Sequence, residues 1–515
     1  MKKIFTYNFL LNMLFSVAAF IFIYMNSVLN SAIDMDYWAR LLQGNAFFEL
    51  GHILKADIFS YTPTHIWLDH EWGASVIFSF IQNNLGYSYV LLFKSILVFL
   101  LFLFIYKTIK LSVKENNLLF DFIYFVVIVF AIPTITQSWL RCHIFTFLFF
   151  VISLFILEKV RLTKKYKLLF LLPVIMLFWV NIHGGCVSLL GLLFIYSIGE
   201  ALNKNEYKYY LLTLLFSIFV MFINPYGIEY VKFIFMASTM PRPFVTEWIS
   251  PFSHPNKMFL VEFKLLYLIN LVILLFSLKN LKRDYTKYLL LIICAYLSFR
   301  YVKNTPFFII VSAIFLYNEL YNLIVLISRK LRINIKYNYI YILLCFILIC
   351  FSGYNIWKNI FYIVYPDLSL QPVSVVRFIK MNNLKGNILA PFDMGSYIAY
   401  KLYPNNLIYM DGRYEEVYYN ETKELLDNFY NLQNNWDEIL DKEYNHDYII
   451  VPKDALLNDY LSKRKDYKII YSDNDNFLYI KSNLKYKINN KMDESIIYDL
   501  LEPFKTSVKY TNNNK

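Results

Sequence analysis

Long apolar runs recur along most of this chain and constrain its fold more than any other feature. A helix needs about 20 mostly apolar residues to cross roughly 30 Å of hydrocarbon. Because 58% of the residues are apolar and 20% aromatic, a soluble domain would have too few charges to cover that surface. We therefore expect a polytopic α-helical membrane protein with about eleven transmembrane helices, at 8–29, 87–106, 118–138, 143–158, 167–181, 186–202, 209–224, 261–278, 286–301, 306–327 and 338–357.

The distribution of lysine and arginine predicts the orientation of these helices, because positively charged loops are retained on the cytoplasmic side. With the N-terminus inside, the inner loops hold 20 Lys and Arg residues and the longer outer loops hold nine. An odd number of spans then sends the C-terminal segment outside. We expect a multi-pass protein of the cell (plasma or inner) membrane, embedded in the lipid bilayer, with an extracytoplasmic C-terminal domain.

The net charge of +12 does not indicate a nucleic-acid partner. Residues 1–357 carry 30 Lys and Arg against 16 Asp and Glu, whereas residues 358–515 carry 20 against 22. The excess of positive charge therefore belongs to the apolar part of the chain, where membrane topology explains it. We expect no nucleic-acid-binding surface.

Three parts follow from the change in composition along the chain. Residues 1–357 are expected to form the transmembrane module, with a long first outer loop at 31–86. Residues 358–482 contain the short apolar runs "NILAPF", "NLIYMDGR", "DYIIVP" and "YKIIYS" between helical patterns, which predicts a small α/β domain. Residues 483–515 form a polar tail with too little apolar content to predict an ordered core.

Polar residues that packing explains poorly all map to the outer face once lysine counting has fixed the orientation. Ionisable groups at a membrane boundary are costly unless they are hydrated or paired, so their gathering on one side predicts a polar cavity there. The candidates are Asp34, Asp36, Trp38, His70 and Glu71 in the first outer loop, followed by Arg141, His143, His183, Glu247, Arg300 and Lys303.

Each candidate also has a simpler explanation when it is taken alone. An isolated Asp-x-Asp pair is more often a solvated loop start, and Asp57 can cap a turn. His183 beside two glycines can break a helix, and Arg300 and Lys303 can extend their charges toward water. "DGR" at 411–413 is typical of a strand-to-turn junction. None of these explanations accounts for the location of all the candidates on the same side of the membrane.

The first outer loop, "DMDYWARLLQGNAFFELGHILKADIFSYTPTHIWLDHEWGASVIFSFIQNNLG", resembles the start of bacterial multi-spanning proteins related to the GT-C glycosyltransferases. The similarity continues through "LRCHIFTFLFF", "WVNIHGG", "NPYG" with "TEW", and "GSYIAYKLYPNNLIYMDGR". The resemblance implies a GT-C-like fold, an acidic motif just after the first helix and a polyprenyl-phosphate-linked sugar as donor. Glu247 is the candidate for a second acidic motif.

Transfer of a sugar from a lipid phosphate needs a base for the acceptor hydroxyl and cations for the departing phosphate. Asp34 and Asp36 are the candidate catalytic residues, and the pair can instead share a divalent cation. Arg141, His143, Arg300 and Lys303 are the candidates for binding the phosphate. Trp38 can stack on the sugar, and His70, Glu71, His183 and Glu247 are further candidate substrate contacts.

Other functions fit the same features. A polysaccharide polymerase or ligase shares the lipid-phosphate chemistry, and a transporter of lipid-linked sugars needs ionisable residues within the membrane. A non-catalytic receptor or scaffold would use the outer α/β domain for binding and would tolerate loss of the "DMD" aspartates. The leading prediction remains a membrane glycosyltransferase with an extracytoplasmic lipid, glycan or protein as acceptor.

Overall fold

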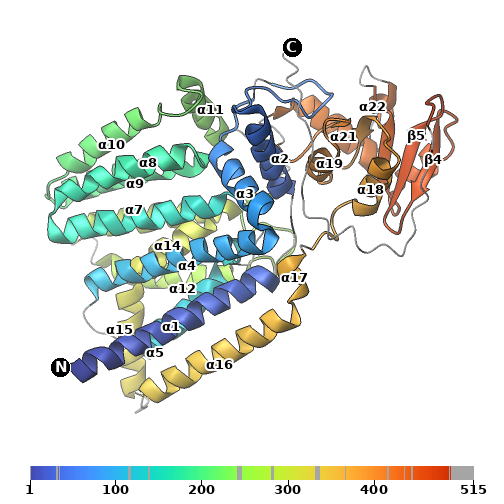
Figure 1. Cartoon of the computed structure of the whole chain (residues 1–515). Helices are drawn as coiled ribbons and strands as arrows, with labels where there is room; N and C mark the ends of the chain where they lie inside the picture. The colour runs from blue at the N-terminus through green and yellow to red at the C-terminus, as the bar shows by residue number, and fades with distance from the viewer. Residues whose placement is uncertain are drawn as a thin grey trace. The chain divides into compact units, whose positions relative to one another are not determined.

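The computed structural model divides the chain into two compact units, each described by itself below (Figure 1). Unit 1 comprises Met1–Asn30, Leu91–Ser138 and Cys142–Ile360, and unit 2 comprises Ser31–Val90, Trp139–Arg141 and Phe361–Lys515. The structure describes residues 2–29, 33, 35–65, 67–113, 117–136, 140–239, 246–279, 284–330, 337–365, 367–413, 417–433, 435–441, 445–486 and 488. Asp34 and nearly all of the expected polar tail lie outside these residues.

Unit 1 is helical throughout its described residues. Its elements are α1 (Lys2–Leu29), α4 (Tyr87–Ser112), α5 (Leu118–Ala131), α6 (Pro133–Thr136), α7 (His143–Thr163), η1 (Tyr166–Phe170), α8 (Leu171–Val180), η2 (Gly184–Cys186), α9 (Val187–Leu202), α10 (Lys208–Val220), α11 (Ile228–Thr239), η3 (Thr246–Trp248), α12 (Val261–Ser277), α13 (Tyr285–Arg300), η5 (Val302–Asn304), α14 (Thr305–Phe315), α15 (Tyr317–Lys330) and α16 (Tyr337–Lys358).

The structure corrects the expected number of membrane spans. All eleven apolar segments contain helix, but only five helices in the described part of the chain are long and apolar enough to cross a membrane. A sixth span is reached if α14 and α15, bent by 58°, cross together. Other segments give shorter apolar helices such as Leu118–Ala131 and Lys208–Val220. Apolar composition predicted helix correctly, whereas helices such as α5 and α10 end before the apolar run does.

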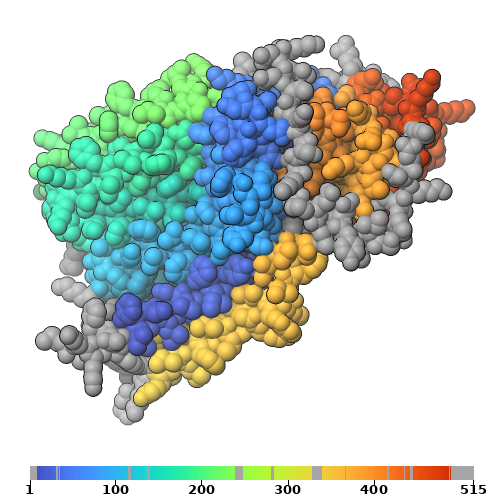
Figure 2. All heavy atoms as spheres, in the orientation of Figure 1, coloured from blue at the N-terminus to red at the C-terminus, as the bar shows by residue number. Residues whose placement is uncertain are grey.

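Helix α16 shows why these segments suit a bilayer. Its outer face presents large apolar side chains, with Phe346 62% exposed, as expected for a surface in contact with lipid. Its inner face packs on α1, which lies beside it in Figure 2, through buried Tyr341 and Cys345. The Tyr341 hydroxyl donates to the Leu11 carbonyl at 2.9 Å, so this buried hydroxyl is satisfied. The described apolar helices thus indicate a membrane-embedded protein.

Unit 2 is an α/β fold whose sheet has the strand order β2-β1-β3-β5-β4. Strands β2, β1 and β3 are parallel, and β5 is antiparallel to both β3 and β4. Its elements are α2 (Met35–Leu50), α3 (Trp72–Leu85), α17 (Phe361–Val364), α18 (Val373–Met381), β1 (Gly386–Leu389), α19 (Gly395–Leu402), β2 (Asn406–Ile408), α21 (Asn420–Asn431), α22 (Glu438–Asp441), β3 (Tyr448–Pro452), α23 (Leu457–Leu461), β4 (Tyr467–Ser472) and β5 (Asn476–Lys481). The four expected strands are confirmed, and β5 is an addition.

The first outer loop belongs to unit 2 because it pairs with the edge of this sheet. Ile408 of β2 donates its N–H to the Phe59 carbonyl at 3.0 Å, and the Tyr61 N–H donates back to Ile408 at 3.1 Å. The Thr62 hydroxyl donates to the Tyr409 carbonyl at 2.6 Å. The loop therefore covers a sheet edge that would otherwise expose backbone groups. The sequence had grouped this loop with the membrane module rather than with the C-terminal domain.

Helix α2 is held between α3 and α19. A Cβ atom added at Gly44 would lie 2.2 Å from the Ser75 carbonyl oxygen, so glycine is required for this close approach of α2 to α3. On the other side, the Trp38 ring packs against Tyr397 and Tyr400 of α19, with centroids 5.0 and 5.3 Å away. This packing fixes the helix whose first turn carries Asp36.

Candidate functional site

The most informative polar contact in unit 2 joins Asp36 to Arg141. The Arg141 Nε lies 3.2 Å from the Asp36 Oδ2, and the two side chains are 17% and 36% exposed. Asp36 occupies the first turn of α2, where the helix dipole favours a carboxylate. The structure therefore brings together two residues that the sequence separates by about 100 positions, and leaves both partly open to solvent.

One turn further along α2, Arg40 holds a second acidic group. Its Nη1 lies 3.1 Å from the Asp69 Oδ1 and 2.8 Å from the Glu71 Oε2, and all three side chains are largely buried. The His70 Nε2 lies 3.8 Å from the Glu71 Oε1. Burial raises the pKa of Asp69, and the adjacent Arg40 guanidinium partly offsets that rise. His70 and Glu71 thus belong to an ion-pair group centred on Arg40, which was not among the predicted site residues.

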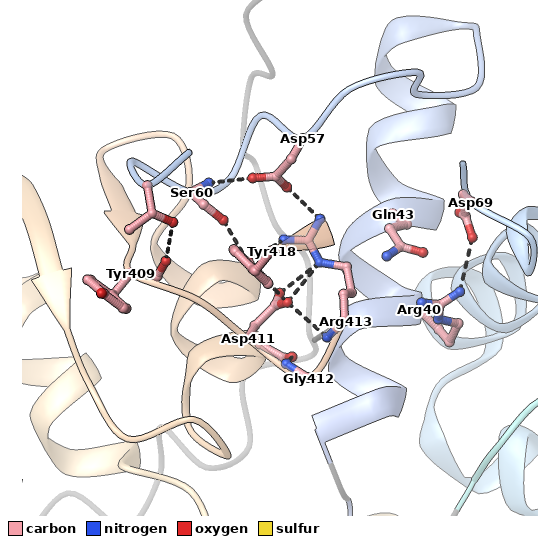
Figure 3. A network of polar contacts seen from close by, with 12 residues as sticks. Arg40, Gln43, Asp57, Ser60, Asp69, Tyr409, Asp411, Gly412, Arg413 and Tyr418 are labelled. Atoms are coloured by element: carbon pink, nitrogen blue, oxygen red, sulfur yellow. Dashed lines mark hydrogen bonds and ion pairs between the residues drawn. The ribbon is translucent and has the colours of Figure 1, made fainter. Parts of the chain in front are cut away.

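A third group, the Arg413 network, joins the first outer loop to the C-terminal part of unit 2 (Figure 3). Arg413 forms ion pairs with Asp411 (Nε to Oδ1, 2.9 Å) and with Asp57, and all three side chains are at most 1% exposed. The Tyr418 hydroxyl lies 2.7 Å from the Ser60 hydroxyl and donates to Asp411 at 3.3 Å. Burial alone would lower the pKa of Arg413, but the carboxylates of Asp411 and Asp57 raise it well above its usual value.

The sequence assigned "DGR" to a turn and Asp57 to a cap, and the structure adds an ionic role to both. The Asp57 Oδ2 does accept the Ser60 N–H at 2.9 Å, as a turn cap would. An arginine five residues after the apolar strand β2 was the available signal, since a buried arginine needs a carboxylate partner. Its partner at Asp57 is 356 positions away and could not be read from the sequence.

Gly412, within this network, touches the start of α2. A Cβ atom added at Gly412 would lie 2.7 Å from the Met35 Cγ and Sδ, so the turn packs against the residue that precedes Asp36. The backbone before Met35 is also held from the C-terminal part of unit 2. The Ile33 N–H donates to the Asp367 carbonyl at 3.4 Å, and the Gln371 side chain donates to the Ile33 carbonyl at 3.4 Å. The entry to α2 is therefore fixed by residues beyond 360.

Trp38, the predicted sugar-stacking residue, lies in the core of unit 2. Its side chain is 0% exposed, and its ring packs against the rings of Tyr37, Tyr397 and Tyr400. Packing between α2 and α19 accounts for this tryptophan.

In unit 1, the structure brings His143 and His183 together. Their ring centroids are 4.8 Å apart. The His183 Nδ1 accepts the Gly185 N–H at 3.0 Å and lies 2.7 Å from the Thr146 hydroxyl, which in turn accepts the Trp179 Nε1–H at 3.0 Å. His183 thus caps the short helix η2, which is the helix-breaking role that the sequence left open.

Lys303 and Trp248 also meet in unit 1. The Lys303 Nζ lies 2.9 Å from the centroid of the Trp248 ring, a cation–π contact that places the ammonium group against an aromatic face. Glu247 precedes Trp248 in η3, and Arg300 is exposed at the C-terminal end of α13. These residues share one unit with His143 and His183, whereas Asp36 and Arg141 belong to the other.

The donor set does not favour a bound metal ion in the described part of the chain. No group of three or more His, Cys, Asp or Glu side chains there is arranged to hold one. The Asp36 carboxylate instead contacts a guanidinium, and its expected partner Asp34 lies outside the described residues. We therefore derive no chemical step through a cation.

Comparison with known proteins adds no family to this description. No protein-family model matches the chain, and no curated protein is significantly similar to it.

Proposed function

We propose that this chain is a membrane glycosyltransferase that moves a sugar from a polyprenyl-phosphate carrier to an extracytoplasmic lipid, glycan or protein. One observation carries the proposal. Asp36, at the start of α2 and a few residues after the apolar helix α1, presents a carboxylate that is 36% exposed and oriented by Arg141. Asp57 and Asp69 of the same loop are instead buried in ion pairs.

In the proposed reaction, Asp36 is the general base. It takes the proton from the acceptor hydroxyl as the acceptor oxygen forms a bond to C1 of the sugar. The C1–O bond to the phosphate breaks, and its electron pair leaves with the polyprenyl phosphate. Arg141 lies next to the base and can share its guanidinium N–H groups with the phosphate, whose negative charge increases as the bond breaks.

The remaining predicted contacts take secondary roles in this proposal. Arg300, whose guanidinium is exposed, and Lys303, whose ammonium is held on Trp248, belong to unit 1 and remain proposed phosphate contacts on the sequence pattern alone. His143, His183 and Glu247 remain proposed substrate contacts, and His70 and Glu71 support α2 through Arg40. The proposal keeps the N-terminus cytoplasmic and unit 2 extracytoplasmic, in line with the lysine distribution.

The test uses the purified full-length protein and a panel of polyprenyl-phosphate-linked hexoses and pentoses. Release of free polyprenyl phosphate and labelling of membrane-extract acceptors are both measured. Loss of a general base typically costs 10²- to 10⁴-fold, so we expect Asp36→Asn to lower the rate at least about 100-fold while donor binding persists. Asp466→Asn, on an exposed carboxylate of unit 2 that pairs with Arg464, is the matched control and should keep the wild-type rate.

The outcomes separate the alternatives. Asp36→Asn at the wild-type rate would remove the catalytic assignment and favour a receptor or scaffold. Movement of an intact lipid-linked sugar across vesicles, without release of polyprenyl phosphate, would indicate a transporter. Products that lengthen by repeated units would indicate a polymerase with the same chemistry.

A further inference from the structure

An apolar cavity of about 270 Å³ lies within unit 1, among α1, α4, α5 and the first residue of α15. Its walls are mainly aromatic and aliphatic, and they include Phe15, Phe102, Phe125 and Ile128. The Phe125 ring lies 5.4 Å from each of the Phe15 and Phe102 rings, so the three helices are linked by ring contacts around the cavity. Since an apolar cavity of about 150 Å³ accepts one benzene, this one has room for roughly ten carbon atoms of a hydrocarbon chain.

One end of the cavity is polar. Asp121, in the first turn of α5, is buried, accepts a hydrogen bond from the Tyr317 hydroxyl and pairs with the Lys110 Nζ at 2.9 Å. That pair cancels the charges of Asp121 and Lys110. Lys107, one turn earlier on α4, also lines the cavity and is exposed, so this end carries a net positive charge from Lys107.

The polar end coincides with the ends of the surrounding helices. Lys107 is five residues, or about 7.5 Å, from the last residue of α4. Asp121 and Tyr317 lie in the first turns of α5 and α15, and Asn12 lies in the N-terminal half of α1. Lysine side chains at such positions reach the lipid headgroups. Asn12 and Lys107 are exposed cavity residues, so the cavity opens to the surface between α1 and α4.

We propose that this cavity binds one acyl chain of an anionic bilayer phospholipid, with the lipid phosphate contacting Lys107. The apolar walls fit the chain, the net positive charge fits the phosphate, and the opening lies between two apolar helices, α1 and α4. A small polar solute does not fit, because the walls beyond the Asp121 end offer almost no hydrogen-bonding groups. This site is independent of the proposed glycosyltransferase activity.

The experiment uses full-length protein in nanodiscs of phosphatidylcholine containing a trace of phosphatidylglycerol with a photoreactive group midway along one acyl chain. After irradiation, peptide mass spectrometry locates the crosslinks. We expect them on cavity residues of α1, α4 and α5, and we expect unlabelled phosphatidylglycerol to compete more strongly than phosphatidylcholine. Crosslinks spread evenly over exposed apolar faces such as that of α16 would overturn the proposal.

Variants separate the chain from the headgroup. Ala19→Phe and Leu103→Phe fill the cavity and should each lower the crosslink yield at least about tenfold, whereas the exposed control Ala201→Phe on α9 should not. Lys107→Gln should reduce the preference for phosphatidylglycerol about fivefold, the usual contribution of one lysine near an anionic surface, and Lys208→Gln should leave it unchanged. Lys107→Gln does not disturb the core, so it decides the question even if a filling variant fails to fold.

Two results would contradict the proposal. Equal competition by phosphatidylcholine would remove the anionic headgroup from it. Stronger competition by polyprenyl phosphate than by phosphatidylglycerol would assign the cavity to an isoprenoid chain instead.

Discussion

Two arginine–aspartate groups in unit 2 are built from the same kinds of side chain and differ in their exposure to solvent. The Arg413 network is sealed from solvent, with side chains at most 1% exposed, whereas Asp36 and Arg141 are 36% and 17% exposed. A buried ion must keep its partners, because no water replaces them. A partly exposed ion pair can exchange a partner for a ligand at a lower cost. The two groups contain the same kinds of residue, so it is their exposure that suits the Arg413 network to stability and the Asp36–Arg141 pair to chemistry.

The largest expected loss of stability follows from Arg413→Met. This variant leaves Asp57 and Asp411 buried without their cation, so we expect the free energy of unfolding to fall by about 3–5 kcal/mol. Denaturant unfolding in detergent micelles measures the change, and limited proteolysis shows whether unit 2 opens. Arg464→Met breaks the exposed pair with Asp466 and serves as the control, with an effect too small to resolve. A loss below about 1 kcal/mol in Arg413→Met would mean that the network does not hold the loop.

A smaller and pH-dependent loss is expected from Arg40→Gln. Asp69 has a raised pKa in the folded protein because of burial, and Arg40 opposes that rise. An acid whose folded pKa exceeds its unfolded pKa favours folding at low pH, and this contribution is lost as the pH rises from about 4 through the folded pKa. Without Arg40, the pKa of Asp69 in the folded protein rises further.

We therefore expect Arg40→Gln to cost about 2–3 kcal/mol at pH 7.5 and distinctly less at pH 5. Thermal unfolding of wild type and variant at both pH values gives the difference. If Arg40→Gln lowers the stability at pH 5 as much as or more than at pH 7.5, Asp69 is not the source of the loss.

A third variant tests the link between the C-terminal part of unit 2 and the start of α2. Gly412→Val places methyl groups against Met35, which should cost about 1–2 kcal/mol. Met35→Ala should restore most of that loss in the double variant. The Cβ atom built at Gly412 lies 3.3 Å from the Met35 Cβ, so cysteines at both positions should form a disulfide on mild oxidation. Failure of both the rescue and the disulfide would contradict the contact.

The sequence predicted what depends on local composition. Apolar length identified the helices, and runs such as "DYIIVP" identified four of the five strands. Strand β5 (Asn476–Lys481) was not predicted. The number of spans was wrong because composition does not show where a helix ends inside an apolar run.

Contacts between distant parts of the chain could not be predicted from the sequence. The pairing of Phe59 and Tyr61 with Ile408, and of Asp57 with Arg413, depends on a register set more than 340 residues away. Asp36 could be singled out as an acidic residue after a span, but its guanidinium partner could not be chosen among the outer arginines. Trp38 lies in the core of unit 2. A tryptophan can pack in a core or stack on a sugar, and the sequence does not distinguish the two roles.

The smallest expected effect on stability is that of Asp36→Asn, and it completes the contrast with Arg413. Asparagine keeps the shape of the side chain, and a half-exposed pair contributes little, so the free energy of unfolding should change by less than about 1 kcal/mol. The same variant is expected to show the largest loss of transfer rate, whereas Arg413→Met should lower activity only in proportion to the protein it unfolds. The test measures both activity per folded molecule and the free energy of unfolding for Asp36→Asn, Arg141→Gln and Arg413→Met. We expect the variant with the largest loss of rate to show the smallest loss of stability. A variant series in which rate and stability fall in parallel would show that Asp36 supports the fold as Arg413 does, because a residue that only contacts substrate has no reason to stabilise the empty protein.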